Sequence, residues 1–196
     1  MVTPEQEAVA DAVHAAARGE RPSWTLVWTA LAEVPDPEIP NVSVLDLGIV
    51  RSVEWDAMSP GLLVVRVTPT YTGCPATDLI AAGIRDALAD LGVVGARIET
   101  VLAPAWSTDW LGPLARQKLR DAGIAPPGTR ERGSAATIDV QGLAPLRRVQ
   151  AGTWSVTCPR CGSASTELVS QFGSTACKAQ YRCRDCLEPF DHFKRL

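Results

Sequence analysis

The chain has 196 residues, a formal charge of −3 and 46% hydrophobic residues, which suits one domain of ordinary size and a smaller second one. No apolar run approaches a membrane span, and the first residues lack the basic start and apolar block of a secretory signal, so we expect a cytoplasmic protein. Residues 143–196 carry eight basic and four acidic residues, whereas the remainder carries eleven and eighteen. The acidic front part argues against nucleic acid as the main partner, and nothing favours a membrane partner.

Helices are predicted over residues 8–18 and 24–34, the second because its apolar positions form one stripe that ends at Pro35. Three prolines at alternate positions follow in Pro35-Asp36-Pro37-Glu38-Ile39-Pro40, and they forbid helix and stiffen the backbone. In an extended stretch, Asp36 and Glu38 would point roughly the same way.

Strands over residues 47–55 and 62–68 are predicted to form a hairpin through the turn Met58-Ser59-Pro60-Gly61. A helix over 76–91, a third strand over 96–102 and a last helix over 108–122, closed by Gly123, follow. Residues 126–146 are rich in Pro, Gly, Ser and Arg and indicate a linker. The expected fold is α/β (α+β), with a small three-stranded sheet and packed helices followed by a small C-terminal zinc ribbon.

Two Cys-x-x-Cys pairs end the chain, Cys158 with Cys161 and Cys183 with Cys186. Each pair can direct two thiolates at one metal, and two pairs complete the tetrahedral shell that zinc prefers. We therefore expect a structural zinc site with no open position for a substrate. Disulfides, free thiols and iron in the same four-sulfur site are alternatives, and spacing does not separate zinc from iron. For Cys177, the roles of buried small hydrophobe, spare ligand and reactive thiol stay open.

The sixth cysteine, Cys74, precedes Pro75 at the predicted start of a helix, which makes Cys74 the expected N-cap. The helix N-terminus would lower the pKa of this thiol and favour a thiolate that ligates a metal or acts as a nucleophile. An inert cysteine under the sheet is the alternative. Asp36, Glu38 and Asp46 could assist a metal, although turn formation explains the first two equally well and a loop-to-strand boundary role suits Asp46.

A catalytic set around the lone cysteine is not apparent. The chain has two histidines, and His14 lies in a predicted exposed helix while His192 stands between aromatic residues of the ribbon, where packing explains it. The chain contains neither a Gly-x-Gly-x-x-Gly motif nor a phosphate loop. We therefore expect a protein that is not itself catalytic.

Three segments resemble the MIP18 (DUF59) family: 36–40, 46–50 and Thr68-Pro69-Thr70-Tyr71-Thr72-Gly73-Cys74-Pro75. That family has a small α/β domain and is linked to iron–sulfur cluster assembly. The segment 105–110 and the tail motif 172–190 resemble, more narrowly, the PaaD (PaaJ) family of accessory subunits of bacterial phenylacetyl-CoA epoxidases. The resemblance implies an N-terminal helical extension (1–23), a MIP18-like domain (24–126), a linker (127–152) and a zinc ribbon (153–196).

The resemblance also implies a role. The chain would be an accessory or maturation subunit of phenylacetyl-CoA 1,2-epoxidase, a multicomponent ring-epoxidising monooxygenase of aerobic phenylacetate catabolism. Cys74 matches the family's cysteine implicated in iron or cluster handling, and Asp36 and Glu38 match its acidic motif. The cofactors would be ribbon zinc and transient iron or an iron–sulfur cluster at Cys74, and the partners would be the oxygenase or iron–sulfur reductase components. Some members carry Cys and His in the linker, but residues 128–146 contain none, so a metal role there is in doubt.

Three other functions remain as alternatives. The chain could be a structural adaptor of the same complex with no metal-transfer role, a thiol enzyme or a ribbon that binds nucleic acid. The charge distribution disfavours the last of these.

Overall fold

The computed structural model describes residues 21–128 and 156–196, so the predicted helix over 8–18, His14 and most of the predicted linker lie outside the described residues. The chain divides into two compact units, the first ending at Ala122 and the second comprising residues 123–195. Within the described ranges, no helix is both long enough and apolar enough to cross a membrane.

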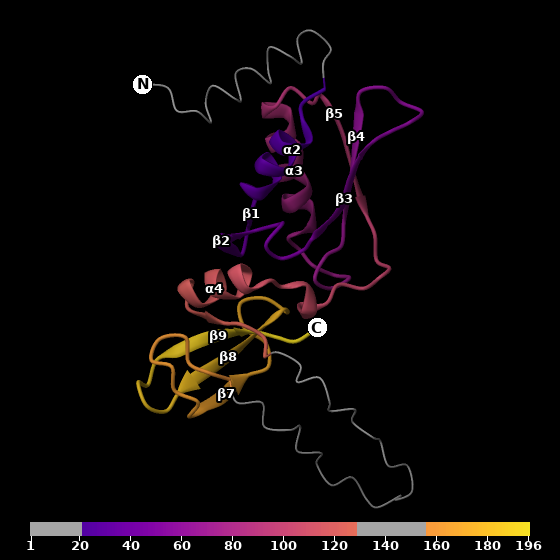
Figure 1. Ribbon diagram of the computed structural model, residues 1–196. Coiled ribbons are helices and arrows are strands. Elements are labelled where there is room, and N and C mark those ends of the chain that lie inside the picture. Colours follow the sequence, from indigo (N-terminus) through magenta and orange to yellow (C-terminus); the bar gives the residue numbers. More distant parts are fainter. Residues whose placement is uncertain (1–20, 129–155) are drawn as a thin grey trace, which may run out of the picture. The chain divides into compact units, whose positions relative to one another are not determined.

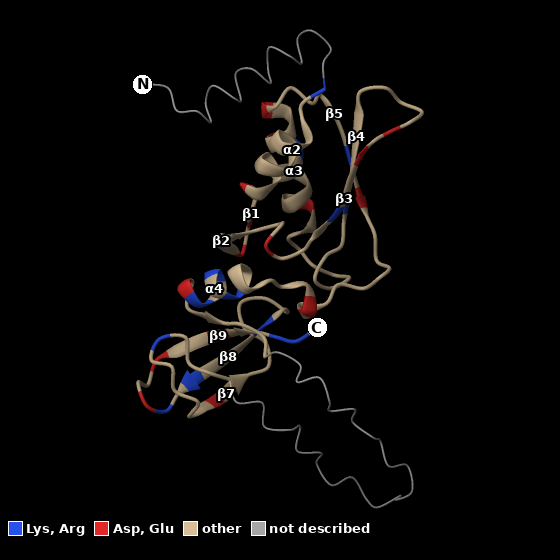
Figure 2. Ribbon diagram, viewed as in Figure 1, with Lys and Arg blue, Asp and Glu red and all other residues tan. Residues whose placement is uncertain are grey.

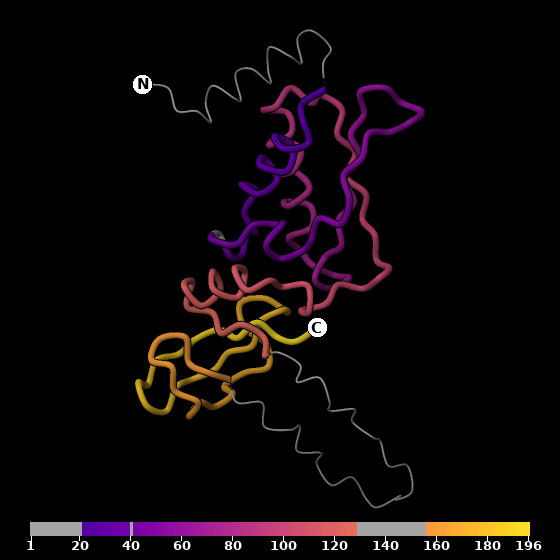
Figure 3. The backbone as a smooth tube through the Cα atoms, in the orientation of Figure 1, coloured from indigo at the N-terminus to yellow at the C-terminus, as the bar shows by residue number. Residues whose placement is uncertain are grey.

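The first unit is built around a three-stranded sheet in the order β3 (Val50–Trp55), β4 (Leu62–Val67) and β5 (Gly95–Thr100). β3 and β4 form the predicted antiparallel hairpin, whose reversal is visible in the chain trace of Figure 3, and β5 returns parallel to β4. A parallel return requires a crossover, which the helix between β4 and β5 supplies. The predicted three-stranded sheet with packed helices is thereby confirmed.

β3 begins three residues later than predicted, because the chain turns before it. Gly48 has φ +66°, in the left-handed region, and its N–H donates to the carbonyl of Leu45 at 2.9 Å. A Cβ at this position would stand 3.3 Å from Cβ of Trp110. Both the backbone conformation and the close approach therefore require glycine.

Figure 1 shows α2 (Trp24–Ala32) and α3 (Thr77–Asp90) on one face of this sheet. α2 begins where the Ser23 hydroxyl oxygen accepts a hydrogen bond from the N–H of Leu26 at 3.4 Å, as an N-cap does. Each helix turns an apolar stripe inward, which is the basis of the core. The buried stripes are Val27 and Leu31 on α2, and Ile80, Ile84 and Leu88 on α3.

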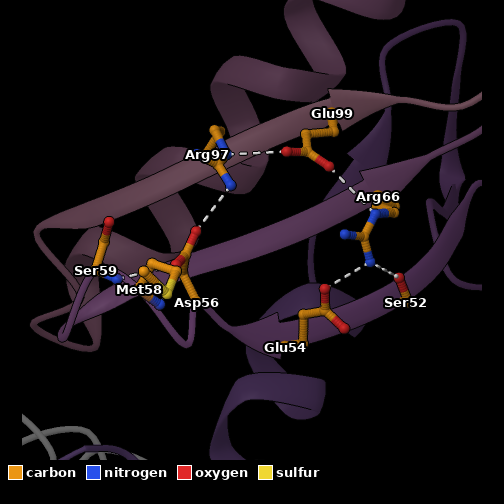
Figure 4. Close-up of polar contacts among 8 residues, drawn as sticks. All are labelled: Ser52, Glu54, Asp56, Met58, Ser59, Arg66, Arg97 and Glu99. Atoms are coloured by element: carbon orange, nitrogen blue, oxygen red, sulfur yellow. Dashed lines mark hydrogen bonds and ion pairs between the residues drawn. The ribbon is translucent and has the colours of Figure 1, made fainter.

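Basic and acidic residues lie along the sheet of the first unit (Figure 2), and their side chains form a network across its three strands (Figure 4). Arg66 pairs with Glu54 at 2.7 Å and with Glu99 at 3.2 Å, while Arg97 pairs with Glu99 and Asp56, each at 2.9 Å. Exposed pairs of this kind add little stability. Since each of these charges is already matched, we interpret the network as a solvated sheet surface.

The proline-rich segment forms a two-stranded hairpin that the sequence did not predict. β1 (Pro35–Asp36) pairs antiparallel with β2 (Ile39–Ser43), so the chain reverses between Asp36 and Ile39. The prolines exclude helix, as expected, but they do not keep the segment extended. Asp36 therefore ends β1 and Glu38 lies in the turn that follows, so the expectation of one extended stretch through both residues is wrong.

The last helix of the first unit is shorter than predicted. A 3-10 turn, η1 (Thr108–Trp110), comes first, and α4 (Pro113–Asp121) starts only at the proline. Gly112, which precedes Pro113, has the extended conformation that proline imposes on its predecessor (φ −70°, ψ 170°). The single helix predicted over 108–122 is therefore wrong, whereas Gly123 follows its end with φ +75°, as expected.

The second unit is a four-stranded sheet in the order β6 (Ile124–Ala125), β9 (Pro189–Phe193), β8 (Lys178–Cys183) and β7 (Thr166–Ser170). β7, β8 and β9 are antiparallel, whereas β6, which follows α4 directly, pairs parallel with β9. One buried cluster of this unit includes two of the paired cysteines. The members are Ala125, Val156, Cys158, Cys183 and Phe190.

Candidate metal centre and cysteine loop

The two Cys-x-x-Cys pairs meet in the second unit. The four Sγ atoms lie within 4.8 Å of one another, with 3.8 Å between Cys158 and Cys186 and 3.6 Å between Cys161 and Cys183. Four sulfurs bound at about 2.3 Å to a tetrahedral zinc stand about 3.8 Å apart, so this arrangement fits one such ion. Across residues 21–128 and 156–196, no other group of three or more Cys, His, Asp or Glu gathers in this way.

The two pairs share one backbone geometry. The N–H of the first cysteine donates to the carbonyl five residues later, at 2.8 Å for Cys158 and 3.0 Å for Cys183. The residue after the second cysteine has a positive φ in both turns, 76° at Gly162 and 63° at Leu187. A leucine with positive φ is sterically unfavourable, so the turn at Cys183 and Cys186 is stabilised by surrounding contacts and not by the conformational preference of Leu187.

The four neighbouring sulfurs shift one another's pKa values, in opposite directions at Cys183 and Cys186. The N–H of Cys186 is the main cause that lowers the pKa of Cys183 to about 7. At Cys186 the N–H of Glu188 favours the thiolate, but desolvation and the neighbouring sulfurs outweigh it and raise the pKa to about 12. A bound cation is what would let all four sulfurs be thiolates together.

Cys177 and His192 lie outside this cluster. Cys177 is buried, with its Sγ 3.0 Å from Oγ1 of Thr175, which favours the small buried hydrophobe among the three roles that the sequence left open. His192 packs edge-on against Tyr181, with 5.4 Å between the ring centroids, and burial lowers its pKa to about 4. The imidazole is therefore neutral near pH 7, and the predicted packing role of His192 is confirmed.

Cys74 lies half-buried in the loop between β4 and α3, and it is not the N-cap. Ala76 occupies that position, and α3 starts at Thr77. The Cys74 carbonyl accepts hydrogen bonds at the helix start, from Oγ1 of Thr77 at 2.8 Å and from its N–H at 3.3 Å. The N-cap prediction is wrong because an additional turn, closed by the Cys74 N–H on the Tyr71 carbonyl at 3.2 Å, precedes the helix.

The pKa of Cys74 is raised, the opposite of the predicted direction. Desolvation is the largest cause and outweighs a hydrogen bond from the N–H of Ala76, and the negative charges of Glu38 and Asp36 raise the pKa further. Both carboxylates are thus close enough to act on the thiol, which remains protonated near pH 7. A metal bound here would have to displace that proton.

The acidic residues are largely engaged in turns. Oδ1 of Asp36 accepts hydrogen bonds from the N–H groups of Glu38 at 2.9 Å and Ile39 at 3.0 Å, so turn formation accounts for this buried carboxylate. Oδ2 of Asp46 accepts from the N–H and hydroxyl of Ser43 at 2.9 and 3.1 Å and forms an ion pair with Lys118. Asp46 therefore has the boundary role that the sequence favoured.

Thr68, which opens the segment 68–75, has an unusual hydroxyl that sequence reasoning missed. The residue is 1% exposed, and its Oγ1 is the one buried side-chain oxygen or nitrogen in the described residues with no hydrogen-bond partner. Its N–H is satisfied by the carbonyl of Ile49 at 2.8 Å. Burial of this kind depends on packing between distant segments, so no local pattern could have indicated it.

Comparisons with known proteins agree with this architecture. Residues 25–101 match the family described as iron–sulfur cluster assembly protein, and residues 143–194 match the PaaD zinc beta ribbon domain. The fold and the four-cysteine cluster thus define a protein of the DUF59 iron–sulfur assembly class that carries a PaaD-type zinc ribbon.

Relatives place the chain more closely. A protein of Escherichia coli (strain K12), named as a putative 1,2-phenylacetyl-CoA epoxidase subunit, is 44% identical over 168 residues, covering 86% of this chain and 90% of that protein. The chain belongs to the family of this epoxidase subunit. A "Fe-S protein maturation auxiliary factor" of Porphyromonas gingivalis is 37% identical over 90 residues, 45% of this chain and 83% of its own length. A crystal structure of a DUF59 domain from Bacillus anthracis is 25% identical with a TM-score of 0.43, covering 56% of this chain and 96% of that one.

Proposed function

We propose that the chain is an accessory subunit of a phenylacetyl-CoA 1,2-epoxidase in the cytoplasm, and that it assists assembly of an iron–sulfur or di-iron centre in that monooxygenase. The observation that carries the proposal is the 44% identity to the E. coli epoxidase relative across 86% of the chain. The E. coli relative is named as an epoxidase subunit, and this is the basis for proposing the epoxidase as the client. The P. gingivalis relative is named as an Fe-S protein maturation factor, and this is the basis for proposing the maturation role.

In this proposal the ribbon metal is structural zinc, held by Cys158, Cys161, Cys183 and Cys186. The sulfur separations suit zinc, and four thiolates leave no position for a substrate. Two of the four ligands, Cys158 and Cys183, belong to a buried cluster of the second unit, so metal binding would contribute to its folding free energy.

Cys74 is the proposed site at which iron or a cluster is held transiently. Glu38 and Asp36 act on its thiol through their charge, although the three side chains do not gather into a ligand group as the ribbon cysteines do. The half-buried thiol and the two carboxylates combine a soft ligand with hard ones. Because the thiol is protonated near pH 7, uptake of the metal would release a proton, and acid would favour release of the metal.

The test is elemental analysis with an absorbance spectrum on anaerobically purified protein, comparing the wild type, Cys74→Ser and the control Cys177→Ser. We expect about one zinc per chain in all three proteins. Additional iron should appear in the wild type and in the control but not in Cys74→Ser, and only Cys74→Ser should fail to load the epoxidase components. Full metal content and activity of the components matured with Cys74→Ser would overturn the metal-transfer role.

A structural adaptor of the same complex is the second candidate. The raised pKa of Cys74 favours it, since a protonated thiol is a poor ligand. It predicts co-purification with the other components in fixed stoichiometry that Cys74→Ser leaves unchanged.

A further inference from the structure

The loop between β7 and β8, residues 171–177, displays an aromatic ring on the surface of the second unit. Phe172 is 67% exposed, and Leu168 and Val169 on the adjoining strand are 47% and 57% exposed. We call these three side chains the Phe172 patch. Exposed apolar side chains on neighbouring segments are candidates for an interaction site, and aromatic residues dominate the energetics of such sites.

The backbone beneath Phe172 is held in place. Oγ of Ser170 donates to the Phe172 carbonyl at 2.8 Å and accepts from its N–H at 3.2 Å. The N–H of Gly173 donates to the Lys178 carbonyl at 2.9 Å, and a Cβ on this glycine would stand 3.1 Å from Oδ1 of Asp191. A loop whose backbone is already held in this way loses little backbone entropy on binding, which favours recognition.

β7 is the outermost strand of its sheet. In the order β6-β9-β8-β7, no strand within residues 21–128 and 156–196 pairs with its outer edge. Backbone groups on such an edge accept an extended segment of another protein. The strand is only five residues long, and its register shifts between Leu168 and Ser170. Short length and a bulge both disfavour flat edge-to-edge pairing of two copies.

The charge beside the patch indicates what the partner carries. Nζ of Lys194 lies 4.7 Å from the centroid of the Phe172 ring and donates to the Gln171 carbonyl at 3.2 Å. Among the described residues, Lys194 has no carboxylate within ion-pair distance, whereas Lys178 and Arg184 pair with Asp191 and Glu167. Lys194 is therefore a cation beside the Phe172 ring with no carboxylate near it in the described residues, and a carboxylate on the partner would complement it.

We propose that the Phe172 patch is the surface by which this chain docks on a component of the epoxidase. The bound segment is extended and apolar, lies along β7 and covers the Phe172 ring, with a carboxylate that meets Lys194. This inference rests on the proposed function and deepens it, because it names the docking surface and the chemistry of the partner segment.

The test measures binding of each purified epoxidase component to the full chain. Phe172→Ser should weaken binding by about 30-fold, as expected for a central aromatic anchor. Lys194→Met should weaken it about threefold and flatten its salt dependence. Val94→Ser is the matched control, because Val94 is 98% exposed and belongs to the first unit, and its affinity should equal that of the wild type. Zinc content and circular dichroism of all variants should match the wild type.

Three outcomes would overturn the docking surface. Equal affinity of Phe172→Ser and Val94→Ser for a component that the wild type binds would refute it and leave the proposed function standing. A wild-type chain that binds no component would refute both. Concentration-dependent self-association that Leu168→Asp abolishes would show that a second copy covers the patch.

Discussion

Replacing Thr68 by valine should stabilise the first unit, which is the reverse of what most substitutions in a core do. The Thr68 hydroxyl is buried with no hydrogen-bond partner in the described residues, and the residue is 1% exposed, so the penalty for burying the group is not relieved by solvent. That penalty is about 1–3 kcal/mol in proteins, and valine has the same shape without the hydroxyl. We expect a gain of at least about 1 kcal/mol, or about 4–8 °C in Tm for a unit of this size.

The assay is urea and thermal unfolding followed by far-UV circular dichroism. Thr77→Val is the matched control, because Oγ1 of Thr77 donates to the Cys74 carbonyl at 2.8 Å. Its loss should cost about 1 kcal/mol. If Thr68→Val were destabilised as much as Thr77→Val, the Thr68 hydroxyl would have a partner in solution, either water or a ligand of the segment that ends at Cys74.

Three further predictions concern the metal centre, the lone thiol and one ion pair. Cys161→Ser should lower zinc affinity at least about 100-fold, since even residues that only contact the metal ligands contribute about 10–100-fold. Cys177→Ser is the control and should keep its zinc affinity. A competition titration with a chromogenic chelator measures both. Glu38→Gln should speed alkylation of Cys74 by iodoacetamide at pH 8, because the Glu38 charge raises the pKa of that thiol; an unchanged rate would contradict the electrostatic argument. Burial raises the pKa of Asp46, but hydrogen bonds from Lys118 and Ser43 outweigh it and hold the pKa below 3.8. Asp46→Asn should therefore cost about 1 kcal/mol at pH 7. That difference should disappear as the pH falls below about 3.8, through the lowered pKa, because wild-type Asp46 then becomes neutral; a difference that persists there would rule out the charge as its source.

Patterns confined to a few neighbouring residues could be interpreted from the sequence alone. The paired cysteines sit in two tight turns, and their spacing is itself the constraint that brings each pair to one metal. The hairpin of β3 and β4 and the stripes of α2 and α3 follow in the same way from periods of two and 3.6 residues. The resemblance to the two families rested on short motifs and is confirmed by matches over residues 25–101 and 143–194.

Only the tertiary structure decided features that depend on residues far apart in the chain. The direction of the Cys74 pKa shift reversed because desolvation and the carboxylates of the β1–β2 hairpin outweigh the helix terminus. β6 belongs to the sheet of the second unit because it pairs with β9, a strand more than sixty residues further along the chain. Local sequence specifies which conformations a segment prefers, but burial and charge at a given atom are set by whatever segments the fold packs around it.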